Sequence, residues 1–242
     1  MIQVLTKEFN SFLNSLIAYV VIGVFLTGIG LLMWVFPETS VLEYGYADME
    51  TLFALGPYVF IFLIPAITMR SFAEEAKAGT LELLLTKPLS DWDIILGKFL
   101  ACFFLVLLSL VPTLIYYFSV AALGNPPGNI DTPGVMGSYI GLTLLGAVFC
   151  AIGIFSSSLT NNQIVSFIVA AFLCYLLFAG FESVSLVNVW SERSLFIKEL
   201  GLLYHYDALS KGLIDSRNLV YFGSVITVML LITRIVLGAR SW

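Results

Sequence analysis

Side chains that could do covalent or metal chemistry are few in this sequence of 242 residues. His205 is the single histidine, and Glu192 and Asp207 are acids of the same region. A catalytic site could be assembled from these three residues only with a nucleophile and a positioned base, and the sequence offers no such pairing. A metal ion would need further ligands that the region does not supply. We therefore expect His205 to have a structural or interfacial role.

The three cysteines do not point to chemistry either. Cys102, Cys150 and Cys174 fall inside long apolar runs, and no two of them form a CxxC pair. Isolated cysteines in such surroundings behave as small buried hydrophobes. We expect neither a disulfide nor a metal site from them.

Charged residues gather instead in the segment 70–96. Alanine, glutamate and lysine favour helix, so the preceding apolar helix is predicted to continue through Glu74 and Lys77. Gly79 suits the left-handed residue that ends a helix. The sequence thus predicts a polar helical extension and then a sharp elbow.

A second short helix is predicted to follow this elbow. Thr80 is a candidate N-cap, and Glu82 lies in the first turn, where the helix dipole favours an acid. Pro88 ends this helix, because the residue before a proline is disfavoured in helical conformation. Ser90 and Asp93 form an acidic variant of the capping box for the next helix. Such a helix between two elbows can offer an apolar ridge to a partner's groove, and an ordinary helical hairpin is the alternative.

The elements that must position these residues are strongly apolar. The chain is 60% hydrophobic and 11% charged, whereas soluble domains are about 45–50% apolar and about 25% charged. Its formal net charge of −5 would repel the phosphates of a nucleic acid. The composition predicts an all-α polytopic membrane protein, organised as one domain over residues 1–242.

Six apolar runs have the length of about 20 residues that a membrane-crossing helix needs. None of these runs contains Asp, Glu, Lys, Arg or His. Ion-coupled transporters usually keep ionisable groups at such depth, so we expect the driving energy to come from elsewhere. The runs are Leu16–Phe36, Thr51–Met69, Phe99–Leu123, Val135–Ser157, Gln163–Phe181 and Leu219–Thr233.

Basic residues predict the orientation of these spans. Counting from the N-terminus, seven of the eleven Lys and Arg residues fall on one side, and the first two loops of the other side have none. Positive residues stay cytoplasmic. We expect both termini and the segment 70–96 in the cytoplasm, and the long loop 182–218 outside, although four basic residues in that loop dilute the bias.

The chain before the first span predicts an amphipathic helix over residues 1–14, suited to the headgroup layer. A plain extension of the first span is the alternative. The apolar residues at helical spacing are Ile2, Leu5, Phe9, Phe12, Leu13 and Leu16.

Two helices are predicted in the loop 182–218. Gly212 is placed to end the second of them. One side of the first is apolar at helical spacing, through Leu195, Phe196, Leu200, Leu203 and Tyr206.

Small residues stand out in the fourth apolar run. Gly137 and Gly141 form a GxxxG step that Gly146 and Gly153 continue, which predicts close helix packing. The serines of 156–158 and the polar residues after them predict only a tight turn between two spans.

The order Glu74-Glu75-x3-Gly79-Thr80-x-Glu82-x-Leu84, followed by Pro88-Leu89-Ser90 and Gly97-Lys98, resembles the segment after the second span of type-2 ABC transporter permeases. The C-terminal part is similar to the permease subunit of the gliding-motility-associated ABC transporter, and to relatives that supply copper-enzyme assembly. That second likeness is carried by the stretch from His205 to Asp215, by Tyr221-Phe222 and by Arg240-Ser241-Trp242.

The resemblance implies a mechanism with two sites. The segment 70–96 would dock on an ATP-hydrolysing subunit through Glu74, Glu75, Gly79, Thr80 and Glu82. The loop 182–218 would form a re-entrant helical hairpin that acts as an outer gate and contains His205, Tyr206, Asp207 and Gly212.

The resemblance also implies partners. These are an ABC ATPase that binds ATP and Mg²⁺, a second permease copy or an accessory membrane subunit with an extracytoplasmic domain, and the lipid of a bacterial inner membrane. For this chain itself we expect no cofactor and no enzymatic activity. It has no GxxxxGK[ST] motif, because Trp92 stands where a P-loop ending in Gly97-Lys98 would need glycine.

Two functions from different classes follow as expectations. The chain is either the permease of an ATP-driven exporter linked to gliding motility, or a non-transporting scaffold that passes ATPase motion to envelope machinery. Flux of a substrate in reconstituted vesicles would favour the first, and nucleotide-driven conformational change without flux the second. The sequence does not indicate a substrate.

Overall fold

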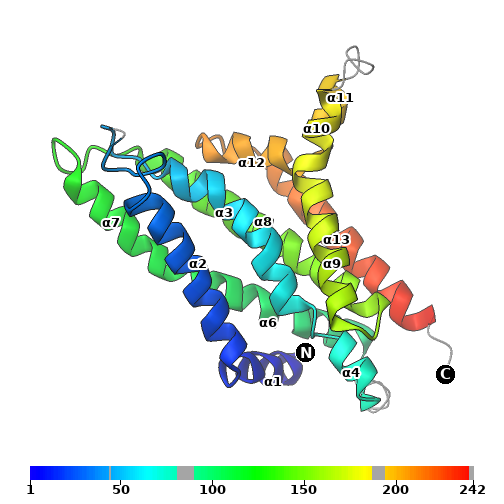
Figure 1. Cartoon of the computed structure of the whole chain (residues 1–242). Coiled ribbons are helices and arrows are strands. Elements are labelled where there is room, and N and C mark those ends of the chain that lie inside the picture. Colours follow the sequence, from blue (N-terminus) through cyan, green and yellow to red (C-terminus); the bar gives the residue numbers. More distant parts are fainter. Residues whose placement is uncertain (44, 81–89, 187–193, 240–242) are drawn as a thin grey trace.

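The computed structural model is all-helical over the residues it describes, which are 1–43, 45–80, 90–186 and 194–239. This confirms the predicted all-α class (Figure 1). In chain order the helices are α1 (Ile2–Leu13), α2 (Leu16–Trp34), α3 (Glu50–Thr68), α4 (Ala73–Lys77), α6 (Asp91–Leu110), the 3₁₀ turn η1 (Val111–Thr113), α7 (Leu114–Leu123), α8 (Thr132–Leu159), α9 (Gln163–Tyr175), the π-helical turn η2 (Leu176–Gly180), α10 (Phe181–Ser185), α11 (Ser194–Glu199), α12 (Leu202–Ser210) and α13 (Ser216–Ala239).

Six helical stretches in the described part of the chain are long and apolar enough to cross a membrane, as predicted. The second reaches Lys77 and the third starts at Asp91, so both extend beyond their apolar runs into the charged segment, as the helix signals at Lys77 and Ser90 predicted. Charged residues therefore belong to the ends of these helices. The stretches are Leu16–Trp34, Glu50–Lys77, Asp91–Leu123, Thr132–Leu159, Gln163–Ser185 and Ser216–Ala239.

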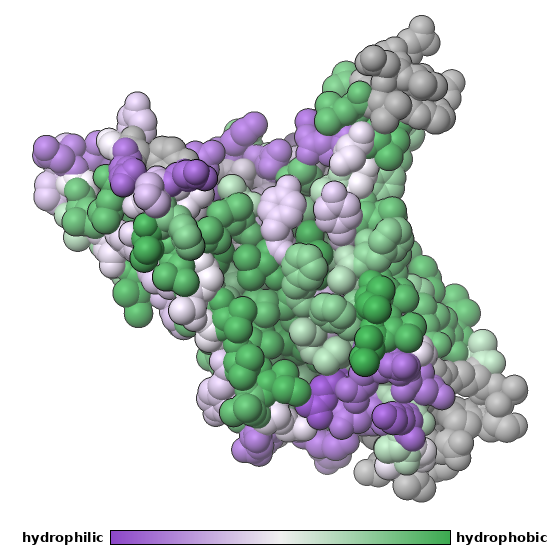
Figure 2. All heavy atoms as spheres, viewed as in Figure 1, coloured by the Kyte–Doolittle hydropathy of each residue, from purple (hydrophilic) through white to green (hydrophobic). Residues whose placement is uncertain are grey.

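The surface has the layering that a bilayer requires. Figure 2 shows apolar residues covering the middle of the visible face and polar residues gathering at its two ends. Large apolar side chains such as Phe62, Phe118 and Ile168 are more than half exposed. A soluble domain rarely leaves so wide an apolar surface in water, which fits the multi-pass membrane assignment.

Helix α8 is the most buried of the six stretches and α13 is the least. Four glycines of α8 contribute to this, because a side chain at Gly137, Gly141, Gly146 or Gly153 would crowd or collide with a neighbouring helix. A Cβ at Gly146 would lie 2.9 Å from Cγ1 of Val106 in α6, and one at Gly153 would overlap the side chain of Thr68 in α3. The predicted close packing is confirmed, and Gly137 and Gly141 serve it against α12.

The two ends of the bundle carry different elements (Figure 1). Helix α1 lies across one end, beside α4, and we call this the α4 end. Helix α12 lies across the opposite end, which we call the α12 end. There α10 and α11 project from the bundle and are joined by an ion pair of 3.0 Å between Glu182 and Lys198.

Helix α1 forms where the sequence predicts it. Val4 and Phe12 are buried against the bundle, while Ile2 is about three-quarters exposed, as is Leu16 at the start of α2. The exposed apolar side chains suit an interfacial helix. Its place in the headgroup layer stays a prediction.

Candidate functional site

The α4 end contains a break in the backbone between α3 and α4. Residues 69–72 form a turn, so the predicted uninterrupted extension of the span through Glu74 is wrong at this point. A turn between two helices leaves backbone donors and acceptors without helical partners, and buried ones must be satisfied by other groups. Side chains of two neighbouring helices supply those partners here.

The first partner is Ser157, a fully buried serine of α8. Its hydroxyl accepts hydrogen bonds from the backbone N–H groups of Phe72 and Ala73, at 2.9 and 3.0 Å, and donates to the carbonyl of Met69 at 3.1 Å. The Ser157 side chain thus caps the start of α4 and gives the carbonyl of Met69, the residue after α3, a hydrogen-bond donor. The prediction that the serine run forms only a polar turn is wrong, because Ser156, Ser157 and Ser158 are all buried within α8.

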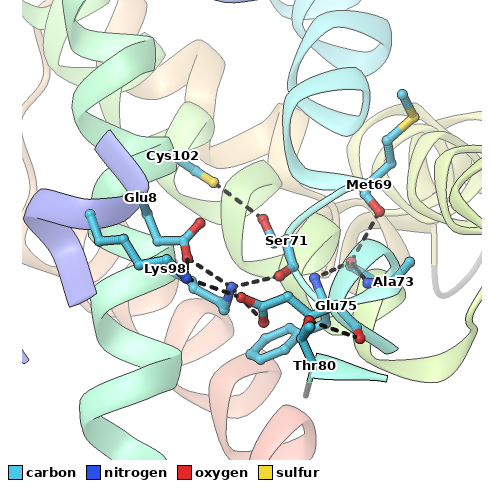
Figure 3. A network of polar contacts seen from close by, with 11 residues as sticks. Glu8, Met69, Ser71, Ala73, Glu75, Thr80, Lys98 and Cys102 are labelled. Atoms are coloured by element: carbon cyan, nitrogen blue, oxygen red, sulfur yellow. Dashed lines mark hydrogen bonds and ion pairs between the residues drawn. The ribbon is translucent and has the colours of Figure 1, made fainter. Parts of the chain in front are cut away.

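The second partner is Lys98 of α6, whose side chain is 1% exposed. Its ammonium donates to the carbonyl of Ser71 at 2.7 Å and to Glu8 of α1 at 3.1 Å. It also pairs with Glu75 of α4 at 2.9 Å and lies 5.1 Å from the ring centre of Phe72. The ammonium thus makes two hydrogen bonds, to Ser71 and Glu8, and one ion pair, to Glu75. Figure 3 shows the oxygens converging on Lys98.

Gly97, the neighbour of Lys98, brings α1 within reach of this network. A Cβ at Gly97 would lie 2.9 Å from Cβ and Cγ1 of Val4. The missing side chain lets α1 approach α6 closely, and that approach places the carboxylate of Glu8 on Lys98. Gly97 therefore sets the distance between α1 and α6, and Lys98 next to it supplies the positive charge that pairs with Glu8.

The elbow after α4 has the predicted geometry. Gly79 has φ +68°, in the left-handed region that favours glycine. The Thr80 hydroxyl donates to the carbonyl of Glu75 at 3.3 Å. The predicted capping box of Ser90 and Asp93 starts α6, with both of its hydrogen bonds formed.

The predicted coupling residues divide into inward and outward groups. Glu75 turns inward to Lys98, whereas Glu74 pairs with Arg70 at 2.7 Å and is about half exposed. Both line a polar cavity of about 430 Å³ to which Thr80 also contributes. Glu82 and Pro88, with the short helix predicted around them, lie outside the described residues.

Lys98 and Glu8 are contributors that the sequence analysis missed. Lys98 entered it only as part of the Gly97-Lys98 pair and among the basic residues, and Glu8 was given no role. The sequence held a clue, because Ile94, Cys102 and Leu105 repeat at helical spacing around Lys98 and are all buried. A lysine on the apolar face of a helix needs a paired acid, although the sequence does not say which one.

The α12 end brings together the residues predicted for the gate. His205 Nε2 donates to the carbonyl of Glu199 at 2.9 Å, and Nδ1 lies 2.8 Å from Oδ1 of Asn218. Its ring stacks on Tyr221 with centroids 3.9 Å apart. These contacts give His205 a structural place between α11, α12 and α13. In the described part of the chain, no three His, Cys, Asp or Glu side chains are grouped to hold a metal ion.

Tyr206 and Asp207 point into different surroundings. Tyr206 is 3% exposed, and its hydroxyl donates to the carbonyl of Phe53 at 2.7 Å. Asp207 lines a cavity of about 440 Å³ at the α12 end, together with Asp131. Partial burial and the nearby Glu182 raise the pKa of the Asp207 carboxyl, and two lysines lower it less. Holding this carboxylate charged therefore costs free energy.

The helices of this region are divided differently from the prediction. A single helix through Leu195 and Tyr206 was expected, but α11 and α12 are separated at Gly201, which has the extended ψ of 142°. A Cβ at Gly201 would lie 3.2 Å from Phe181. Leu195 and Phe196 of the expected apolar side are 73% and 64% exposed, whereas Tyr206 is buried, so the bundle covers only the α12 part of that side. Gly212, with φ +76°, follows α12 and ends it as predicted.

A comparison with protein families identifies the chain. A family model described as "ABC-2 family transporter protein" matches residues 3–239. No curated protein matches the sequence. Because the model covers nearly the whole chain, including both ends of the bundle described above, the protein belongs to the ABC-2 family of transporter proteins and is a multi-pass transporter membrane subunit.

Proposed function

We propose that this chain is the permease subunit of an exporter in a bacterial inner membrane, driven by a separate ABC ATPase that docks at the α4 end. The α4 end then faces the cytoplasm and the α12 end faces outward. Most basic residues of the sequence fall on the α4 side, as the positive-inside rule requires. The ATPase binds ATP and Mg²⁺, and this chain contributes no P-loop.

The observation that carries the proposal is the backbone break at residues 69–72. A continuous helix would transmit a push on α4 along α3 alone. The break is instead bonded to α8 through Ser157 and to α6 through Lys98. Displacement of α4 is therefore passed to several membrane helices at once, which is what a coupling element must do.

The α1 helix belongs to the same assembly. Glu8 and Glu75 share the Lys98 ammonium, at 3.1 and 2.9 Å, and α1 leads into α2 with only Asn14 and Ser15 between them. The coupling residues Glu74, Gly79, Thr80 and Glu82 are then the surface that meets the ATPase, while Glu75 anchors that surface to the bundle.

The α12 end is proposed as the outer gate of this permease. A single chain offers six helices, so a second copy or an accessory membrane subunit with an extracytoplasmic domain completes the pathway. The likeness of residues 205–215 to the permease of the gliding-motility transporter supports a role of the complex in gliding.

Affinity purification of the tagged chain from its native membranes, with identification of any P-loop ATPase that accompanies it, tests the proposal. Gly79→Pro and Glu82→Arg should abolish co-purification and nucleotide turnover by the complex, since a proline cannot adopt φ +68°. Gly45→Pro is a matched control at φ +70° at the other end of α3, and Glu43→Arg is a matched charge reversal there.

Undiminished complex formation and turnover in both coupling variants would refute docking at the α4 end. Reconstitution with the ATPase then separates the exporter from the scaffold. Nucleotide-dependent efflux of labelled lipid or peptide cargo supports the exporter, and nucleotide-driven conformational change with no flux would overturn it.

A further inference from the structure

Pro57 lies inside α3 and has no N–H to donate. In a regular helix the carbonyl of residue 53 accepts from the N–H of residue 57, so Pro57 frees the carbonyl of Phe53. That carbonyl lies in a buried region, since Phe53 is 6% exposed. The Tyr206 hydroxyl of α12 donates to it at 2.7 Å. The partner that the proline removes is replaced by a residue 153 positions away in sequence.

Helix α12 also packs on α8 at two glycines, which have no side chains. A Cβ at Gly141 of α8 would lie 3.2 Å from the Tyr206 ring, and one at Gly137 would overlap the Leu209 carbonyl. Helix α12 therefore rests on bare backbone, without side chains interlocked from the α8 side at these positions. One further hydrogen bond, from Ser138 to the Ser210 carbonyl at 3.1 Å, joins α12 to α8.

Helix α12 is also built to move as a unit. Gly201 precedes it in extended conformation, and Gly212 follows it with φ +76°, so a glycine stands at each end. On one side of α12 lies the cavity of about 440 Å³, lined by α3, α8 and α12. The partly buried Asp207 faces that cavity, and release of α12 would return its carboxylate to water. The contacts of His205 with Asn218 and Tyr221 join α12 to α13, whereas the Tyr206 hydroxyl joins α12 to α3 beside the cavity.

We propose that α12 opens and closes on the ends of α3 and α8, and that the Tyr206 hydroxyl on the carbonyl freed by Pro57 is the latch of the closed state. The proposal rests on the proposed function only in giving this motion the role of a gate. The opening itself requires neither nucleotide nor partner, so it can be tested on the purified chain.

A double-mutant cycle isolates the latch. Tyr206→Phe keeps the ring and removes the donor, which leaves a buried carbonyl unpaired and should raise the open population roughly tenfold. Pro57→Ala restores an N–H at residue 57 that can pair with that carbonyl. In the Pro57→Ala background, Tyr206→Phe should therefore change the open population less than twofold. If the two sites were independent, Tyr206→Phe would have the same roughly tenfold effect in both backgrounds.

Opening is measured as the rate of modification of a cysteine by a hydrophilic maleimide, with the modified residues identified by mass spectrometry of peptides. Leu209→Cys is the reporter, because Leu209 lies on α12 and is fully buried in the closed state. Tyr204→Cys is the matched control on the exposed side of α12, since Tyr204 is 38% exposed. The natural Cys102, Cys150 and Cys174 are buried in the spans and report global unfolding in the same sample.

The proposal expects Tyr206→Phe to accelerate modification of the Leu209→Cys site about tenfold, with the Tyr204→Cys site and the natural cysteines unchanged. It expects Pro57→Ala to cancel the acceleration. An unchanged rate in Tyr206→Phe, a failure of Pro57→Ala to cancel it, or parallel modification of the natural cysteines would each overturn the latch. A positive result with no accompanying ATPase would leave the latch in place and refute only the proposed function.

Discussion

Replacing Lys98 by methionine should destabilise the α4 end more than any other single charge removal there. Methionine is apolar and of similar length, so the change removes the charge with little change in volume. Among the described residues, the carboxylates of Glu8 and Glu75, whose side chains are 13% and 17% exposed, would then keep Lys7 at 3.6 Å as their basic partner. Removing one partner of a buried ion pair costs about 3–5 kcal/mol. We expect a loss of that size for Lys98→Met.

The controls are graded by burial. Lys7 contacts the same two carboxylates, but its side chain is 63% exposed, so Lys7→Met should cost about 0–1 kcal/mol. Glu8→Gln leaves Lys98 with Glu75 and the Ser71 carbonyl, and should cost about 1–3 kcal/mol. The triple variant Glu8→Gln/Glu75→Gln/Lys98→Met removes every charge of the cluster and should regain part of the loss, since no charge is left unpaired.

Two measurements are made on the purified chain in detergent. Unfolding curves give the loss of stability, and hydrogen exchange at residues 69–77 reports local opening. Lys98→Met should raise exchange in this stretch and leave the backbone of α12 unchanged. If Lys98→Met costs no more than Lys7→Met, the Lys98 contacts do not hold the break between α3 and α4. Equal exchange at both ends of the bundle would refute the local role in the same way.

Three further outcomes are expected. Gly153→Ala should lower stability by about 1–3 kcal/mol or more, because the alanine Cβ would overlap the Thr68 side chain. Gly23→Ala is the control, since a Cβ there would have nothing within 4 Å, and it should leave stability unchanged or slightly raised. Thermal unfolding compares the two variants. Ser157→Ala leaves two backbone N–H groups unpaired and should cost about 1–3 kcal/mol, seen as faster hydrogen exchange at the start of α4. Burial and a nearby acid raise the pKa of Asp207, so wild-type stability should fall as pH rises from the ordinary carboxyl pKa through the raised one. Asp207→Asn should remove that fall and be the more stable protein at pH 7. Melting curves between pH 4 and 8 would show both effects.

The helices and their packing could be predicted from sequence because each depends on local composition. Apolar length gave six spans, and a glycine at every close approach of α8 follows from the volume that a Cβ occupies. The left-handed Gly79 and Gly212 were predictable for a related reason, since glycine adopts φ near +70° without the steric cost that a Cβ brings. These features need no knowledge of which helices are neighbours.

The polar contacts at the two ends could not be predicted, because each joins residues far apart in sequence. Lys98 meets Glu8 across 90 positions, and Ser157 meets Phe72 across 85. A run of three serines after an apolar span is typical of a turn, and only the position of α8 in the centre of the bundle turns Ser157 toward the break. The break itself was missed because the residues around it favour helix, and the bonds from α6 and α8 outweigh that preference.

The two ends of the bundle differ in how firmly their moving parts are held. At the α4 end, three oxygens from α1, α4 and the break surround one buried ammonium. Taking that ammonium away from its two carboxylates costs about 3–5 kcal/mol. At the α12 end, hydrogen bonds hold α12 to α3 through Tyr206, to α8 through Ser138 and to α13 through His205. Losing the Tyr206 bond costs about 1–3 kcal/mol. In the proposed permease, a force applied to α4 would therefore reach α1, α6 and α8 before their charged contacts separate, whereas the Tyr206 hydrogen bond can break at lower cost. A gate driven from the opposite end of the bundle requires this order, because otherwise the displacement would be lost at the α4 end.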